Sequence, residues 1–130
     1  ALQAAGLAQD PALQVSASES TELAGERGLR ELLARGAAFD AVFAASDLLA
    51  IGAIRALSES GRRVPQDVAV VGFDDIPIAN YTSPPLTTVS QDAKRAGEIL
   101  VDTLLREIRR EPVRSLMLPA RAVVRRSCGA

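Results

Sequence analysis

Two pairs of polar residues directly follow apolar runs of the chain, and their side chains could bind a small polar molecule. Ser46 and Asp47 follow the run AVFAA, and Asp74 and Asp75 follow the run VAVVGF. If the two runs are parallel strands of one sheet, their carboxyl ends lie on the same edge, where open α/β sheets bind their ligands. Carboxylate oxygens at this edge would accept hydrogen bonds from a ligand, which suits a sugar, another polyol or an amine.

Each pair also has a purely structural interpretation. Ser46 or Asp47 could cap the following helix, because short polar side chains accept hydrogen bonds from the first free N–H groups of a helix. Asp74 and Asp75 could simply begin a turn. Adjacent residues usually point in different directions, and no catalytic partner is visible in the sequence, so we do not expect the two aspartates to perform acid–base catalysis.

The residue types that most often carry catalysis or bind metals are scarce. The chain has no histidine and one cysteine, Cys128, which rules out Ser–His and Cys–His pairs and the usual zinc sites within it. Neither a P-loop nor a dinucleotide-binding glycine pattern is present. We therefore expect no enzyme activity, no metal site and no cofactor. Cys128 is expected to be an inert residue in a loose tail, and a single thiol gives no sign of an oxidising compartment.

The composition predicts a globular domain without a surface for nucleic acid or membranes. The chain has 130 residues, 48% of them hydrophobic and 3% aromatic, and a net charge of −1. A nearly neutral chain with few aromatic residues has neither a strong attractive field for nucleic acid or anionic membranes nor a surface for base stacking. Arginines near the C-terminus are interpreted as charges at a helix end and on a solvated strand face: Arg109, Arg110, Arg114, Arg121, Arg125 and Arg126.

Strands and helices alternate along the chain. Residues 1–7 resemble the end of a helix and contain no initiator Met, so we expect the chain to begin within a longer protein. The expected helices begin at Ser20 or Thr21, at Ser46 or Asp47, and at Asp92, and they end near residues 36, 61 and 110. The expected strands or extended segments are 13–17, 41–45, 68–73, 86–90, 116–118 and 122–125. Fully apolar strands are typical of parallel sheets, with both faces buried, so the pattern predicts an open, mostly parallel α/β sheet with helices on both faces.

Three blocks of the chain closely resemble the lactose-repressor (LacI) family of transcriptional regulators. They are FDAVFAASD with AIGA, between residues 39 and 53, RVPQDVAVVGFDD at 63–75, and PLTTVSQ at 85–91. The sequence PARAVVRRS at 119–127 also resembles the last strand of the family. The blocks follow one another in the family's order and spacing and cover most of the chain.

The resemblance implies a fold and a function. Family members join an N-terminal helix-turn-helix to a two-lobed core similar to periplasmic sugar-binding proteins, and a small effector between the lobes changes the affinity for operator DNA. Residues 1–130 would form the C-terminal part of this core, without the helix-turn-helix and most of the first lobe. A cytoplasmic homodimer is expected, with operator DNA bound by the missing domain and not by this chain. The alternative is a solute-binding protein of a sugar transporter, and the sequence upstream of the chain would distinguish the two.

The resemblance also implies a set of ligand-binding residues. Asp74 matches an aspartate that bonds effector hydroxyls or amines, and Gln91 matches a position that can line the cleft. Two positions depart from the family pattern: Ser46 stands where asparagine is common, and Ser20 stands where an aromatic residue commonly stacks on the ligand. These departures leave open whether the effector is a typical sugar.

A dimer surface is the last feature that the resemblance implies. In the family, the contact uses the helix that follows the strand at 41–45 and the segment that follows the aspartate pair. The residues at these places are Ile51, Arg55, Ile78 and Tyr81. Ile51 and Arg55 lie one turn apart on one helix face, and tyrosine is favoured at interfaces. The alternative is that Ile51 faces the sheet of its own lobe.

Overall fold

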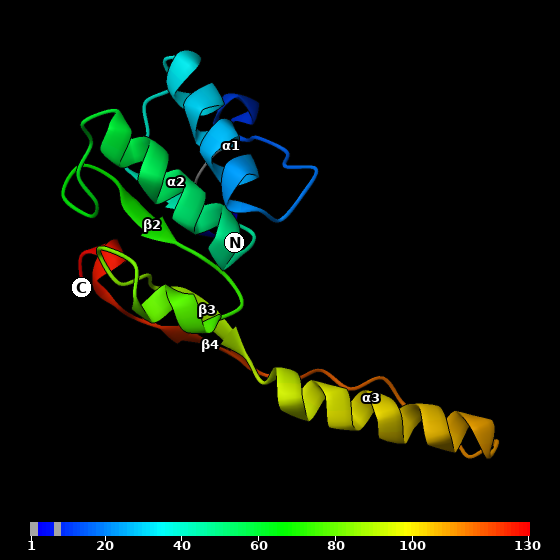
Figure 1. Cartoon of the computed structure of the whole chain (residues 1–130). Coiled ribbons are helices and arrows are strands. Elements are labelled where there is room, and N and C mark those ends of the chain that lie inside the picture. The colour runs from blue at the N-terminus through cyan, green and yellow to red at the C-terminus, as the bar shows by residue number, and fades with distance from the viewer. Residues whose placement is uncertain (1–2, 7–8) are drawn as a thin grey trace.

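The fold consists of helices and strands that alternate as the sequence predicts, in a computed structural model that describes residues 3–6 and 9–130. The helices are α1 (Glu22–Ala34), α2 (Asp47–Glu59) and α3 (Ala93–Ile108), and the strands are β1 (Ala41–Phe43), β2 (Ala69–Val71), β3 (Thr88–Gln91) and β4 (Ala120–Val123) (Figure 1). Short 3-10 helices are η1 (Gln3–Ala5), η2 (Pro11–Leu13), η3 (Pro77–Asn80) and η4 (Arg126–Cys128). Residues 1, 2 and 7 of the predicted helix end at 1–7 lie outside the described part.

The strands form a parallel pair, β1 and β2, and an antiparallel pair, β3 and β4, which two isolated parallel bridges connect into one open arrangement. β1 and β2 pair in parallel, with Val42 opposite Val70. Backbone hydrogen bonds of 2.9 Å from Gly72 N–H to Thr87 C=O and from Asp74 N–H to Val89 C=O connect the end of β2 to β3. The two bridges between these segments, Val71 with Thr87 and Asp74 with Ser90, are parallel. β4 adds an antiparallel edge beside β3. The prediction of an open, mostly parallel α/β fold is confirmed.

The three helices begin at polar side chains that accept a hydrogen bond from the first helical turn. Thr21 accepts from Ala24 N–H at 3.2 Å, Ser46 from Leu49 N–H at 3.3 Å, and Asp92 from Arg95 N–H at 2.8 Å. These contacts satisfy N–H groups that have no partner within the helix. The predicted helix starts are therefore confirmed, and Ser46 rather than Asp47 is the cap of α2.

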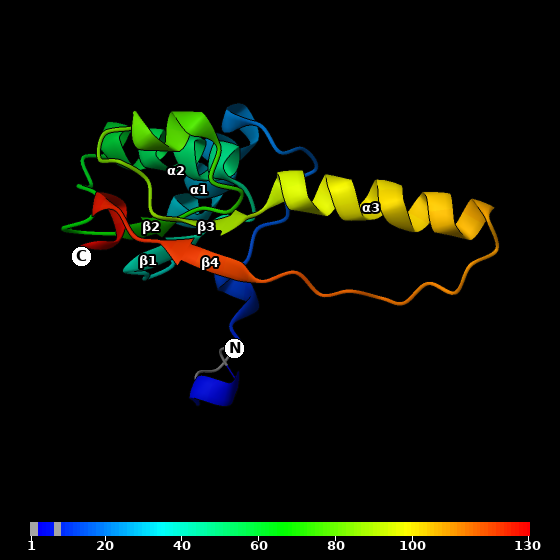
Figure 2. The same ribbon diagram turned by 90° about the horizontal axis from the view of Figure 1, so that it is seen from below.

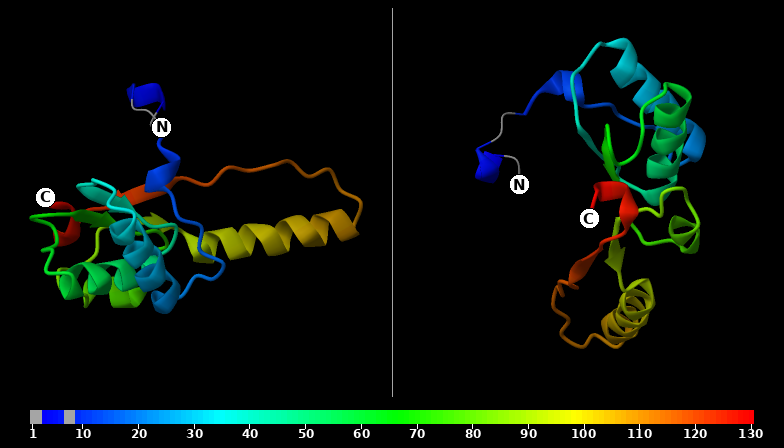
Figure 3. Two further views of the ribbon diagram at one scale, coloured as in Figure 1. Left: turned by 90° about the horizontal axis from the view of Figure 1, so that it is seen from above. Right: turned by 90° about the vertical axis from the view of Figure 1, so that its left-hand side faces the viewer.

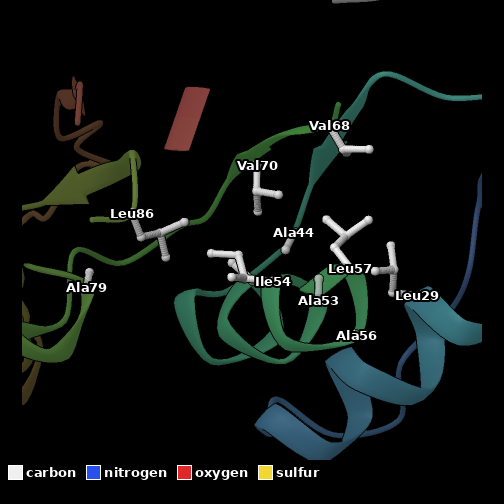
Figure 4. Packing of buried hydrophobic residues seen from close by; sticks show 11 residues of the cluster. Leu29, Ala44, Ala53, Ile54, Ala56, Leu57, Val68, Val70, Ala79 and Leu86 are labelled. Carbon is white, nitrogen blue, oxygen red and sulfur yellow. The ribbon is translucent and has the colours of Figure 1, made fainter. Parts of the chain in front are cut away.

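The hydrophobic core lies between α2 and the sheet. Leu57 of α2, Val68, Val70 and Leu86 are each fully buried. Figure 4 shows the side chains of Leu57, Val68 and Val70 in the space between α2 and the strands. α1 packs against α2, and both helices lie on the same side of the β1–β2 pair (Figures 2 and 3). This arrangement fixes the carboxyl ends of β1 and β2, which carry the candidate site residues.

β1 is less buried than its apolar sequence predicts. Val42 is half-buried and packs against the core, whereas Phe43 is 66% exposed. Successive side chains of a strand point to opposite faces, so α2 can cover Val42 and not Phe43. The expectation that both faces of this strand are buried is therefore wrong for the described residues.

α3 projects away from the rest of the molecule as an arm, and residues 109–119 return from its far end to β4 (Figures 1 and 2). None of its residues is buried, although it is clearly amphipathic. Its exposed large apolar residues are Leu100, Val101, Leu104, Leu105 and Ile108.

None of the helices that the structure describes is long and apolar enough to cross a membrane.

Residues 116–118, expected to be an extended segment, belong to no helix or strand. Two further expectations about local structure are wrong. Residues 13–17 form no strand, because Leu13 is the last residue of η2 and the segment has no ladder partner among the described residues. The C-terminal tail is not loose. Its Ser127 is fully buried, donates a hydrogen bond to Val70 C=O at 2.6 Å and accepts one from Thr87 N–H at 2.8 Å. Cys128 is half-buried beside Thr87, whose hydrogen bond lowers the pKa of the thiol.

Candidate ligand-binding site

The carboxyl ends of β1 and β2 lie side by side, as the sequence predicts for parallel neighbours. Ala44 N–H donates to Val71 C=O at 2.9 Å, and Asp47 N–H donates to Phe73 C=O at 2.8 Å. The residues that follow the two strands therefore share one edge of the sheet. β3 continues this edge, because Asp74 and Ser90 form a parallel bridge.

Asp74 and Gln91 form the exposed part of this edge. Gln91 Nε2 donates to Asp74 Oδ1 at 3.4 Å, a long hydrogen bond that leaves most of the acceptor capacity of the carboxylate free. Asp74 has φ of 112°, a conformation that few residues other than glycine adopt. The structure thus brings together two of the four predicted ligand-binding residues, and both face solvent.

Asp47 has a structural role that the sequence did not reveal. It is fully buried, Oδ1 accepts from the Thr88 hydroxyl at 2.5 Å, and Oδ2 accepts from Ile76 N–H at 2.9 Å. A β-carbon on Gly72 would lie 2.3 Å from Asp47 Oδ1, so only glycine leaves room for this carboxylate. Asp47 therefore holds both the loop after β2 and the first residue of β3.

Asp75 has a different partner from Asp74 and forms an ion pair with the C-terminal segment. Arg125 Nη2 lies 2.7 Å from Asp75 Oδ1, and Arg125 Nη1 donates to Leu86 C=O at 2.8 Å. The hydrogen bond from Arg125 holds the pKa of the Asp75 carboxyl below its ordinary value, with the Coulombic attraction of the same guanidinium acting in the same direction. The interpretation of Arg125 as a charge on a solvated strand face is therefore wrong, because its side chain is only 13% exposed.

Ser46 and Ser20 occupy different surroundings. Ser46 is buried, and its hydroxyl caps α2 by accepting a hydrogen bond from Leu49 N–H. The next residue, Asp47, donates its backbone N–H to Phe73 C=O. Ser20 is exposed and lines a hollow of about 600 Å³ between residues 13–17, α1 and β1. Asp74, Gln91 and Ser46 do not line that hollow. The contacts that join Asp74 to Gln91 therefore do not extend to Ser20.

The predicted dimer residues are partly engaged within the lobe. Ile51 is half-buried and packs against the core, so part of its side chain already serves this lobe. Arg55 is exposed and pairs with Glu59 at 3.0 Å. Ile78 is 49% exposed and Tyr81 is 83% exposed, which leaves two large side chains available on and beside η3.

Comparison with known proteins agrees with this geometry. A family model described as a periplasmic binding protein-like domain matches residues 1–128. The regulator CelR of Thermobifida fusca is 47% identical over 131 residues, covering 98% of this chain and 38% of CelR. The ribose operon repressor of Haemophilus influenzae is 41% identical over 105 residues, covering 79% of this chain and 32% of the repressor.

Solved structures of regulators have the same fold. The CelR–cellobiose complex matches with a TM-score of 0.89 and 46% identity, covering 97% of this chain and 39% of that one. The lac repressor dimer bound to operator and the anti-inducer ONPF matches with a TM-score of 0.80 and 36% identity, covering 85% and 34%. The chain thus spans less than two fifths of these regulators. It belongs to the periplasmic binding protein-like family, in the group of LacI-type regulators.

Proposed function

We propose that this chain is the C-terminal part of the effector-binding core of a DNA-binding transcriptional regulator that responds to a sugar or a related small polar metabolite. The helix-turn-helix and most of the first lobe would lie outside residues 1–130. The observation that carries the proposal is the exposed Asp74 carboxylate beside the Gln91 amide, at the edge of the sheet where α/β proteins bind ligands. Curated relatives of this chain are regulators, which favours this function over a transporter component.

The chemistry of the site suits a ligand with several hydroxyl groups. The Asp74 carboxylate would accept from hydroxyls in charge-assisted hydrogen bonds, which are stronger than neutral ones. The Gln91 amide can both donate and accept, which matches a hydroxyl that does the same. Ser46, whose hydroxyl already caps α2, and Ser20, which lines a separate hollow, remain predicted contacts of the effector. Because the CelR structure contains cellobiose, this disaccharide is the first ligand to test.

The exposed apolar stripe of α3 supports a first lobe that lies mostly outside residues 1–130. Its large apolar side chains would be costly to leave in water, and β3 and β4 connect this arm to the lobe described above. In the complete core, the first lobe would cover the stripe, and the effector would sit between the lobes. An effector that binds one arrangement of the lobes more tightly shifts the population toward it, which changes the affinity for operator DNA.

The complete protein would act as a cytoplasmic homodimer on operator DNA. A two-fold dimer would bring the same surface from each subunit together, with Ile51, Arg55, Ile78 and Tyr81 at the contact. Two linked DNA-binding domains would then contact two half-sites. This chain alone would not bind operator specifically, since it has a net charge of −1 and would lack the recognition helix.

Two observations on the full-length protein test the function. The coding sequence upstream of residue 1 should encode a helix-turn-helix, and a secretory signal peptide there would instead support the transporter alternative. A gel shift with the promoter region of the protein's own operon, with and without cellobiose, should show specific binding that the sugar changes. If the full-length protein binds no DNA specifically, either with or without cellobiose, the result would contradict the proposal.

A further inference from the structure

We infer that Arg125 is a positioning residue for the effector site: it fixes the loop that carries Asp74 without contacting the ligand. The inference rests on the proposed function of Asp74, but its structural part can be tested separately. Arg125 lies 50 residues after Asp75 in the chain, two residues beyond the end of β4, and still forms an ion pair with that loop at 2.7 Å.

Three contacts fix the position of Arg125. Its guanidinium binds Asp75 Oδ1 through Nη2 and the carbonyl oxygen of Leu86 through Nη1, both within 2.8 Å. Its backbone N–H donates to the Thr87 hydroxyl at 2.8 Å. The side chains of the ion pair are only 13% and 20% exposed, for Arg125 and Asp75 respectively. A pair shielded in this way is screened less by solvent and salt than the exposed pairs on α1 and α2.

The loop needs such support because its backbone is unusual. Asp74 has φ of 112° and Asp75 has φ of 58°, so two successive residues with side chains adopt positive φ. Conformations of this kind are costly and persist only where the surroundings hold them. Asp47 holds the loop at Ile76 N–H, and Arg125 holds it at the Asp75 carboxylate. Without Arg125, the backbone at residues 74–75 would lose one of these two restraints. The Asp74 carboxylate would then no longer be held in one direction beside Gln91.

The test compares variants of the full-length protein by hydrogen exchange and by calorimetry with cellobiose. The variants are Arg125→Met, Arg125→Lys, Asp75→Asn and the double variant Arg125→Met/Asp75→Asn, with the exposed neighbour Arg126→Met as the matched control. Exchange is followed by mass spectrometry in peptides that contain the bonded amides of Asp74 and Ile76, and in peptides from the centre of α2.

Arg125→Met should accelerate exchange at residues 74–76 by about tenfold or more, with a much smaller change in α2, and should weaken cellobiose binding by about tenfold. Arg125→Lys should show smaller changes in both exchange and binding, because its ammonium keeps the charge but cannot bond Asp75 and Leu86 C=O together as the guanidinium does. The double variant should be no worse than Asp75→Asn alone, and Arg126→Met should resemble the parent protein.

Unchanged exchange at residues 74–76 in Arg125→Met would overturn the inference. Equal acceleration of exchange at 74–76 and in α2 would also overturn it, because a residue that only stabilises the fold would loosen the whole lobe. Additive effects of Arg125→Met and Asp75→Asn would also count against it. If the parent protein does not bind cellobiose, that result speaks against the proposed ligand, and the exchange measurement still decides the role of Arg125.

Discussion

The Asp47 carboxylate accepts a 2.5 Å hydrogen bond from the Thr88 hydroxyl, and both side chains are completely buried although 41 residues separate them. The same carboxylate accepts the N–H group of Ile76. One side chain at the start of α2 thus connects the loop that bears the candidate site to the first residue of β3. This contact makes the geometry of the site dependent on α2.

Replacement of Asp47 by alanine should therefore destabilise the fold. The change leaves the Thr88 hydroxyl and the Ile76 N–H group buried without a partner, which should lower the free energy of unfolding by about 2–4 kcal/mol. Asp47→Asn retains one acceptor oxygen and should cost less. Urea denaturation of the two variants and the parent chain measures the effect. Equal stability of Asp47→Ala and the parent chain would show that the contact is unimportant.

Two glycines at the crossing of α1 and α2 give a second prediction. A β-carbon on Gly52 would lie 1.9 Å from Glu22 C=O, and one on Gly25 would lie 2.1 Å from Leu49 C=O, so the helices cannot stay this close if either glycine is replaced. Gly52→Ala should lower the free energy of unfolding by about 1–3 kcal/mol. The control is Gly97→Ala in α3, and both variants are made in the chain of residues 1–130, where no neighbouring atom lies within 4 Å of this position.

Gly97→Ala should raise stability by up to about 1 kcal/mol, because alanine favours the helix and meets no obstacle. Thermal denaturation of both variants separates the two effects. A Gly52→Ala variant as stable as Gly97→Ala would show that the helices move apart without cost.

The Asp75–Arg125 pair predicts a dependence of stability on pH. The hydrogen bond from Arg125 holds the pKa of Asp75 below its ordinary value of 3.8, so the folded state favours the ionised carboxylate. Its stabilising contribution is complete above the unfolded pKa and is lost as pH falls through the lower folded pKa. Asp75→Asn should be less stable than the parent chain at about pH 7, and the difference should shrink below about pH 4. Urea midpoints measured across this range check the sign, and a difference that grows toward acid pH would contradict it.

The proposed dimer surface can be tested by adding charge. Ile51→Glu together with Tyr81→Glu in the full-length protein should give monomers, because two-fold symmetry places like charges against each other at a surface stripped of water. Operator affinity should fall as well, since two half-sites need two linked DNA-binding domains. Sedimentation velocity measures the assembly, and Leu13→Glu with Leu23→Glu, at exposed positions outside the proposed surface, is the control. A dimer that persists in the Ile51/Tyr81 variant would place the interface elsewhere.

Short-range features of the fold could be predicted from the sequence. Thr21, Ser46 and Asp92 cap their helices through residues three positions ahead, so the sequence near each of them contains the whole interaction. The shared edge of β1 and β2 followed from their apolar character and from the rule for parallel strands. The position of Asp74 at that edge could therefore be anticipated.

Contacts between distant polar groups could not be predicted in this way. Asp47 and Thr88 are 41 residues apart and Ser127 and Val70 are 57 apart, and hydrophobic periodicity contains no information about which polar groups meet. Arg125 lies in a basic sequence, where a half-buried guanidinium and a solvated one look alike. The exposure of Phe43 shows a related limit, because an apolar strand does not reveal which of its faces a helix will cover.

We propose that Asp74 binds the effector, and isothermal calorimetry of the full-length protein with cellobiose measures this contact. Asp74→Ala should weaken binding by about 1–3 kcal/mol, or roughly fivefold to 150-fold, because ligand hydroxyls lose their charged acceptor. Its affinity for operator without the sugar should stay close to that of the parent protein. An Asp74→Ala variant that binds cellobiose as tightly as the parent protein would contradict the claim.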